Sequence, residues 1–214
     1  MLARADGIRG GGWSSQGPTD QLLKRSQLEF LQEVVGPALQ SERDYRIPAS
    51  ITIAQCILES AGKVNGTWTW GASWLFREAN NPFGIKHRHH GGEEAYEECS
   101  VKTAELENGK LEKQRAIFQR FSDLASAFGA HALLFLTLPR YQPAIRVRDD
   151  WQKFAVALME CGYSTDRPEL CQQVGCIHYA GKLINLVNHY RLNDSRALAW
   201  YAMGEDPGSK NSER

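Results

Sequence analysis

Apolar side chains recur at helical spacing through most of the chain. Segment 27–39 carries four of them on one helical face: Leu28, Leu31, Val34 and Val35. Pro37 stands near the expected end of that helix. Pro48 suits the first turn of a second helix running to about Ser60, because the N–H it lacks is not needed there. Further helices are predicted at 122–137, 150–161, 168–190 and 194–203.

One segment departs from helical spacing. Residues 99–107 and 110–118 flank Asn108-Gly109, the strongest short-range signal for a β-hairpin. A two-residue turn pairs three sets of residues: Glu107 with Lys110, Leu106 with Leu111, and Glu105 with Glu112. The leucines then share one face, and Glu105 and Glu107 share the other. The pattern predicts a mainly α (α+β) fold, with a helical lobe, a small β-hairpin lobe and room for a polymer between them.

Composition narrows the class of protein. The 214 residues are 42% hydrophobic and 23% charged, the balance of a soluble globular protein with one core. Lys plus Arg and Asp plus Glu both number 25, so no net field steers the chain to nucleic acid or to an anionic membrane. The longest apolar run, residues 132–138, is too short to span a bilayer. We therefore expect no nucleic-acid partner and no membrane insertion.

Polar ends bracket the predicted domain. Residues 1–20 are rich in Gly and Ser, and residues 205–214 are charged and contain Pro and Gly. We expect a flexible N-terminal segment at 1–20, a single domain at 21–203 and a flexible tail at 204–214. Residues 1–12 lack the apolar core of a secretory signal, so any export is expected to use a leader already removed or other machinery.

Neither the cysteines nor the histidines follow a metal-site pattern. The five cysteines are unevenly spaced, and most are expected to be small buried apolar residues. A Cys171–Cys176 bridge and a Cys161–Cys171 bridge are both left open. The basic run KHRHH at 86–90 lacks the spacing that brings ligands together on one ion, which favours a solvated loop. We expect no metal and no cofactor.

The second predicted helix ends in a carboxylate, Glu59, that could act as an acid in catalysis. In ITIAQCILES, residues 51–60, Glu59 shares a stripe of polar or small residues with Gln55 and Cys56, beside an apolar stripe. Burial disfavours the charged form, so the pKa of Glu59 should rise. Cutting a glycosidic bond requires such a protonated acid beside the leaving oxygen near neutral pH. Position alone favours the plainer alternative, a helix-end glutamate that faces water.

The motifs around Glu59 favour the interpretation of this residue as a catalytic acid. Their order along the chain is IAQ at 53–55, ES at 59–60, WGAS at 70–73, NNPFGIK at 80–86, TAE at 103–105, an aromatic pair at 118 and 121, and GYSTD at 162–166. Together they resemble the glucosaminidases of glycoside hydrolase family 73, which include flagellar peptidoglycan hydrolases and bacterial autolysins. The resemblance spans roughly residues 27–192. The chain departs from the family at residues 61–69, which lengthen the loop after Glu59 and add Trp68.

The resemblance implies a lysozyme-like helical lobe and hydrolysis of the β-1,4 bond between N-acetylglucosamine and N-acetylmuramic acid. Glu59 would protonate the leaving oxygen. Glu105 would act as a base on water or stabilise the transition state, unless the acetamido group of the substrate is the nucleophile. Tyr163 would contact the sugar beside the scissile bond. The plainer alternatives are a solvated hairpin charge for Glu105 and a core aromatic for Tyr163.

Five further residues are expected to contact the glycan: Trp68, Trp70, Asn81, Phe83 and Glu107. Tryptophans offer flat faces to sugar rings, although at least one of Trp68, Trp70 and Trp74 should belong to the core. Asn81 is also expected to fix a turn through side-chain hydrogen bonds, and Phe83 to pack between the lobes. Glu107 is the alternative to Glu105 as second carboxylate.

Two other functions compete with the glucosaminidase hypothesis. One is a muramidase or lytic transglycosylase of lysozyme-like fold, which also places a glutamate at a helix end. The other is a wall-binding module without catalysis, since a fold does not fix a function. In every case the expected partner is a peptidoglycan glycan strand, met by a monomer in the periplasm, in the cell wall or after secretion.

Overall fold

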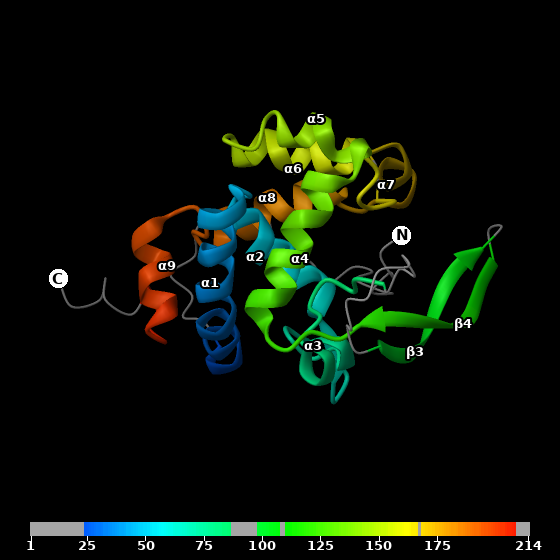
Figure 1. Cartoon of the computed structure of the whole chain (residues 1–214), viewed down its shortest axis with the longest axis horizontal. Helices are drawn as coiled ribbons and strands as arrows, with labels where there is room; N and C mark the ends of the chain where they lie inside the picture. Colours follow the sequence, from blue (N-terminus) through cyan, green and yellow to red (C-terminus); the bar gives the residue numbers. More distant parts are fainter. Residues whose placement is uncertain (1–23, 87–97, 108–109, 167, 209–214) are drawn as a thin grey trace.

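Helices α1 (Arg25–Tyr45) and α2 (Ala49–Ser60) pack together in the body of the structure (Figure 1). It is a computed structural model that describes residues 24–86, 98–107, 110–166 and 168–208. Helix α1 continues past Pro37 because buried positions at helical spacing continue too, with Ala38 at 0% and Ser41 at 4% exposure. Packing therefore outweighs the hydrogen bond that the proline removes.

Helix α2 is buried on every side. Pro48 stands immediately before its first residue, and residues 49–58 are all buried. The polar stripe predicted for this helix faces the protein interior, since Gln55 is 0% and Thr52 is 2% exposed. Thr52 satisfies its hydroxyl by donating to the carbonyl of Pro48 at 3.1 Å.

The segment after α2 is a second β-hairpin, where we expected a loop. Strands β1 (Gly62–Val64) and β2 (Thr67–Thr69) pair antiparallel, with Lys63 opposite Trp68. Asn65 and Gly66 turn the chain with φ of 50° and 80°, the left-handed conformations that a two-residue hairpin turn needs. Helix α3 (Trp74–Ala79) follows, and Ser73 caps it by accepting a hydrogen bond from the Phe76 N–H.

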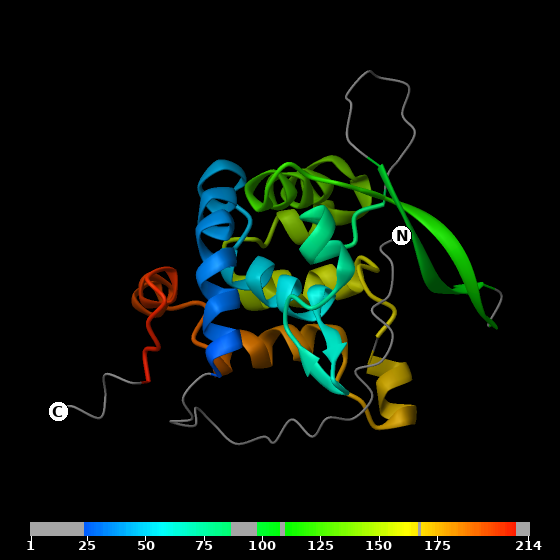
Figure 2. The ribbon, with the colours of Figure 1, turned by 90° about the horizontal axis from the view of Figure 1, so that it is seen from below.

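The long hairpin has the predicted register. Strands β3 (Glu98–Glu107) and β4 (Lys110–Gln119) pair Glu107 with Lys110 and Glu105 with Glu112. At its base, Phe118 and Cys99 pack with Ala79 in a small separate apolar cluster. From there the hairpin projects away from the helices, as two perpendicular views show (Figures 1 and 2).

The second half of the chain is helical. It contains α4 (Leu124–Thr137), the 3-10 turn η1 (Pro139–Tyr141), α5 (Gln142–Ile145), α6 (Trp151–Glu160), α7 (Pro168–Val174), α8 (Tyr179–His189) and α9 (Ser195–Ala202). The single helix predicted at 168–190 is wrong. Gly175 takes φ of 67° and a Cys171–Cys176 disulfide closes the break, so α8 starts afresh at Tyr179.

One large core joins α1, α2, α4, α6 and α8. Its largest fully buried side chains include Tyr141, Phe83, Phe128, Phe135 and Phe154. After α9, the Gly204 and Glu205 N–H groups donate to the carbonyls of Tyr201 and Trp200, and Pro207 is buried. The first part of the expected flexible tail is therefore bonded to α9. Across the described segments, every helix is too short or too polar to cross a membrane.

Candidate active site

Glu59 lies at the one position of α2 that reaches the surface. Every other residue of the helix is buried, whereas Glu59 keeps partial contact with solvent. Burial raises the pKa of Glu59 from 4.5 to about 7; the Tyr179 hydrogen bond lowers it, Asp166 raises it and Lys182 lowers it. The expected rise therefore occurs, and with a pKa of about 7 Glu59 can keep its proton close to neutral pH. A carboxyl that is both protonated and accessible can donate a proton to a bound molecule.

A hydrogen-bonded chain orients this carboxyl. The Tyr179 hydroxyl donates to Glu59 Oε1 at 3.3 Å, and Gln55 Nε2 donates to the Tyr179 hydroxyl at 3.2 Å. Tyr179 is only 4% exposed, at the first turn of α8. Sequence reasoning missed Tyr179, because a single helix over 168–190 hides the fact that this residue begins a new one.

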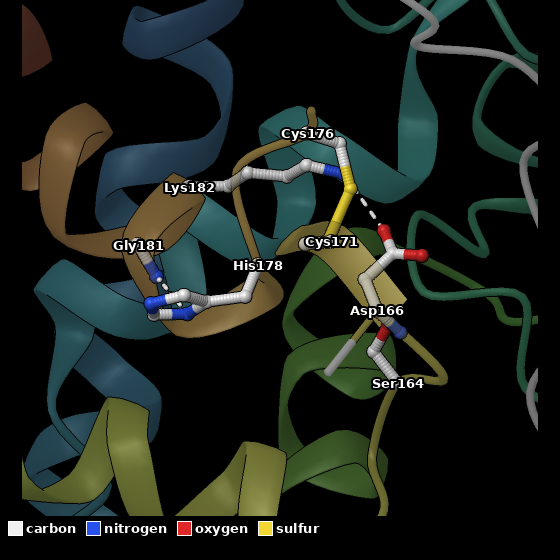
Figure 3. Close-up of a disulfide and its surroundings, with 7 residues drawn as sticks. All are labelled: Ser164, Asp166, Cys171, Cys176, His178, Gly181 and Lys182. Carbon is white, nitrogen blue, oxygen red and sulfur yellow. Dashed lines mark hydrogen bonds and ion pairs between the residues drawn. A yellow bond between two sulfur atoms is a disulfide. The ribbon is translucent and has the colours of Figure 1, made fainter. Parts of the chain in front are cut away.

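Two charged groups complete the surroundings of Glu59. Asp166 and Lys182 form an ion pair, with Asp166 Oδ2 2.7 Å from Lys182 Nζ (Figure 3). Asp166 belongs to the GYSTD motif, whereas Lys182 lies one turn into α8. The Cys171–Cys176 disulfide closes the segment between them, which settles the alternatives left open for the cysteines.

Tyr163 is largely buried, and its expected contact with the sugar stays a prediction. It is 7% exposed, and its hydroxyl lies 3.1 Å from Nε2 of the fully buried His131. Burial lowers the pKa of His131 to about 3, so this imidazole is neutral. The Tyr163 ring stacks on Tyr179, with centroids 5.4 Å apart. The hydroxyl of Tyr163 therefore lies next to a buried imidazole, and the ring of Tyr163 supports the ring of Tyr179 by packing against it.

Asn81 and Phe83 are also interior residues, each 0% exposed. Asn81 donates to the carbonyls of Ile85 at 2.9 Å and Gln119 at 2.8 Å, and accepts from the Ile85 N–H at 2.9 Å. The turn-fixing role expected of Asn81 is confirmed, and it joins the NNPFGIK segment to β4. The Phe83 ring stacks on His131 at 3.8 Å between centroids. We therefore reassign both residues from glycan contact to structural support.

The tryptophans divide between core and surface. Trp70 is partly buried and packs edge-on against Phe30 and Tyr190 at the margin of the core, and its expected contact with glycan stays a prediction. Trp68 on β2 is 37% exposed, with Lys63 Nζ 5.6 Å from its ring centroid. Trp74 at the start of α3 is 47% exposed.

The second carboxylate stays a prediction. Glu105 and Glu107 lie two positions apart on β3, which places them on the same face of the hairpin. Their side chains lie outside what the structure describes. The histidines expected in a solvated loop at 87–90 lie outside it as well. Within the part of the chain that is described, no three His, Cys, Asp or Glu side chains gather as a metal ion would require.

A helical body with a glutamate of raised pKa at the end of its buried helix, joined to a projecting β-hairpin, has the features expected of a lysozyme-like glycoside hydrolase. Comparison with known proteins narrows the class. The model of the glucosaminidase family, described as mannosyl-glycoprotein endo-beta-N-acetylglucosaminidase, matches residues 36–192. The chain belongs to this family.

Individual relatives agree with this assignment. Exo-glucosaminidase LytG of Bacillus subtilis (strain 168) is 32% identical over 173 residues, covering 78% of this chain and 53% of LytG. Peptidoglycan hydrolase FlgJ of Escherichia coli (strain K12) is 27% identical over 191 residues, covering 87% of this chain and 54% of FlgJ. The chain thus spans about half the length of these relatives. The C-terminally truncated glycoside hydrolase domain of Salmonella typhimurium FlgJ superposes with a TM-score of 0.56 at 27% identity, covering 78% of this chain and 98% of that domain.

Proposed function

We propose that this protein is a peptidoglycan hydrolase that cleaves the β-1,4 bond between N-acetylglucosamine and N-acetylmuramic acid within glycan strands, with Glu59 as its proton donor. The observation that carries the proposal is a pKa of about 7 for a carboxyl that is still accessible to solvent. The glucosaminidase family match and the relatives named for glucosaminidase or peptidoglycan hydrolase activity support the choice of substrate.

The proposed reaction assigns one task to each group. Glu59 gives its proton to the glycosidic oxygen as the bond to the anomeric carbon breaks, and becomes a carboxylate. The Tyr179 hydroxyl, which already donates to Glu59 Oε1, stabilises that carboxylate. Positive charge at the anomeric carbon is met by Glu105 or Glu107 on β3, as base on water or as counter-charge, or by the acetamido oxygen of the sugar.

The proposal extends to the setting of the reaction. Residues 21–203 act as one catalytic domain and as a monomer. The Cys171–Cys176 disulfide supports an oxidising compartment, such as the periplasm, the cell wall or the exterior. An exo-acting enzyme is the second candidate, because the relative with 32% identity is named an exo-glucosaminidase.

Glu59→Gln tests the acid, because the amide keeps the shape of the side chain but has no acidic proton to give. We expect the clearing rate of purified cell walls to fall about 100-fold or more. Glu160→Gln is the matched control, since Glu160 is an exposed glutamate at the end of α6. Equal rates for wild type and Glu59→Gln would show that another group is the acid.

Mass spectrometry of the products tests the bond and the mode of attack. Reducing N-acetylglucosamine ends are expected. Reducing muramic ends would indicate a muramidase, and anhydro-muramic ends a lytic transglycosylase. Early release of long fragments supports internal cleavage, whereas early release of small units alone supports the exo-acting alternative. Wall binding without any product would indicate the non-catalytic module.

A further inference from the structure

Asp166 holds the start of α8 at two points. Its backbone carbonyl accepts from the Tyr179 N–H at 2.9 Å, and its carboxylate binds Lys182 at 2.7 Å, one turn further along the helix. Asp166 is held in turn, because its N–H donates to Ser164 Oγ at 3.1 Å (Figure 3). The residue that begins α8, Tyr179, is also the one that donates to Glu59. Asp166 therefore fixes the hydrogen-bond donor of the proposed acid without touching that acid.

A loop connects Asp166 to the start of α8. The loop contains α7, and the Cys171–Cys176 disulfide links two of its residues before α8 begins at Tyr179. His178 caps the returning helix by accepting from the Gly181 N–H at 3.1 Å. The disulfide limits the shape of this loop, but it does not fix the position of Asp166 relative to α8. The contacts of Asp166 with Tyr179 and Lys182 fix that position.

The ion pair also places opposite charges near Glu59. The negative charge of Asp166 raises the pKa of Glu59, and the positive charge of Lys182 lowers it. The other titratable groups that interact with Glu59 in the described chain are the hydroxyls of Tyr163 and Tyr179 and the thiol of Cys56. Burial raises the pKa of all three well above the ordinary value, so they are uncharged near neutral pH.

We propose that the Asp166–Lys182 ion pair is a positioning device, which holds Tyr179 against Glu59 and balances the electrostatic field at that carboxyl. The inference rests on the proposed function, since it concerns the residue assigned as acid. Side chains of Asp166 and Lys182 are 36% and 21% exposed, so each charge is partly screened and its effect is moderate.

Removing the two charges one at a time is the decisive experiment, because their effects have opposite signs. Asp166→Asn keeps the backbone carbonyl and an acceptor for Lys182 but loses the negative charge. The alkaline limb of the pH–kcat profile should then move to lower pH by about 0.5 unit, the effect of one partly solvated charge. Lys182→Met should move the same limb to higher pH by a similar amount. The double variant should lie between the single ones, and Lys182→Arg should restore the wild-type limb.

Asp149→Asn is the matched control for the loss of one negative charge. Asp149 pairs with Arg46 on the surface, where their side chains are 84% and 70% exposed, and the limb should not move. A role limited to folding would lower activity or the unfolding temperature in both single variants without opposite displacements of the limb. Shifts in the same direction, or none beyond the control, would overturn the inference.

Direct titration of Glu59 separates this inference from the proposed function. In protein with 13C-labelled glutamate carboxyls, the signal missing from Glu59→Gln identifies Glu59. Its midpoint should fall in Asp166→Asn and rise in Lys182→Met. If the midpoints follow that order but no wall is cleaved, the inference holds and the proposed function fails. If walls are cleaved and the midpoints coincide, the inference fails alone.

Discussion

One oxygen of Glu59 accepts a hydrogen bond from Tyr179, and the same hydroxyl accepts from Gln55. Removing this hydroxyl with Tyr179→Phe takes away a donor that favours the carboxylate, so the pKa of Glu59 should rise. It also leaves the amide of Gln55, which is 0% exposed, without its acceptor. We expect the alkaline limb of the pH–kcat profile to move to higher pH and the free energy of unfolding to fall by about 1–3 kcal/mol.

The matched control at this scale is Tyr163→Phe, the same substitution on the neighbouring stacked ring. The hydroxyl of Tyr163 lies 3.1 Å from His131 Nε2, whereas the hydroxyl that donates to Glu59 is that of Tyr179, so Tyr163→Phe should reduce stability and move the pH profile less than Tyr179→Phe does. Urea unfolding and pH–rate profiles of the two variants make the comparison. An alkaline limb displaced as far in Tyr163→Phe as in Tyr179→Phe, or unmoved in Tyr179→Phe, would argue against Tyr179 as the partner of Glu59.

At the scale of elements, local signals predicted much of the fold. Apolar spacing located α1, α4 and α6, and the Asn108-Gly109 signal predicted the register of β3 and β4. The same dipeptide at 65–66 forms β1–β2, but strands of three residues are too short to show alternation. The break before α8 depends on a disulfide and a left-handed glycine, which apolar spacing does not reveal.

Local sequence signals predicted part of the candidate site, and tertiary packing determines the rest. The high pKa of Glu59 could be predicted, because the composition of α2 alone implies that the helix end is desolvated. The partner Tyr179 lies 120 positions away in the chain, so only the packing of α8 on α2 brings the two together. The inward direction of Tyr163 and Phe83 depends on His131, to which no local signal pointed.

The β1–β2 hairpin is the element with a function still to be measured. It starts at Gly62, three residues after Glu59, and it presents the exposed ring of Trp68 beside the ammonium group of Lys63. If it forms a wall of the substrate site, Trp68→Ala should raise KM for glycan strands several-fold and leave kcat unchanged, because a stacking face contributes about 1 kcal/mol. Trp74→Ala, at a still more exposed ring on α3, is the control. Equal KM values in both variants would remove the hairpin from the site.

For the molecule as a whole, the partly exposed Glu59 and the buried His131 make the free energy of unfolding depend on pH in opposite directions. Glu59 has a pKa of about 7 when folded and 4.5 ordinarily, so its contribution is present at low pH and is lost as pH rises towards 7. His131 has a pKa of about 3 when folded and 6.5 ordinarily, so its contribution is present above 6.5 and is lost as pH falls towards 3. Between about pH 4.5 and 6.5, Glu59 lowers the free energy of unfolding as pH rises and His131 raises it. The two effects oppose each other, so the free energy of unfolding changes less with pH.

Glu59→Gln removes the pH dependence of stability that comes from Glu59 and leaves the one that comes from His131. Relative to wild type, the variant should gain stability steadily from about pH 4.5 to 7, by at most about 1.4 kcal/mol per pH unit. Because Glu59 is partly exposed, we expect the total gain to be about 1–2 kcal/mol. Urea unfolding at four pH values measures the difference, in which titrations common to both proteins cancel. A constant offset between the two curves would mean that the carboxyl of Glu59 ionises as easily in the folded protein as in the unfolded chain, and that it holds no proton for catalysis at neutral pH.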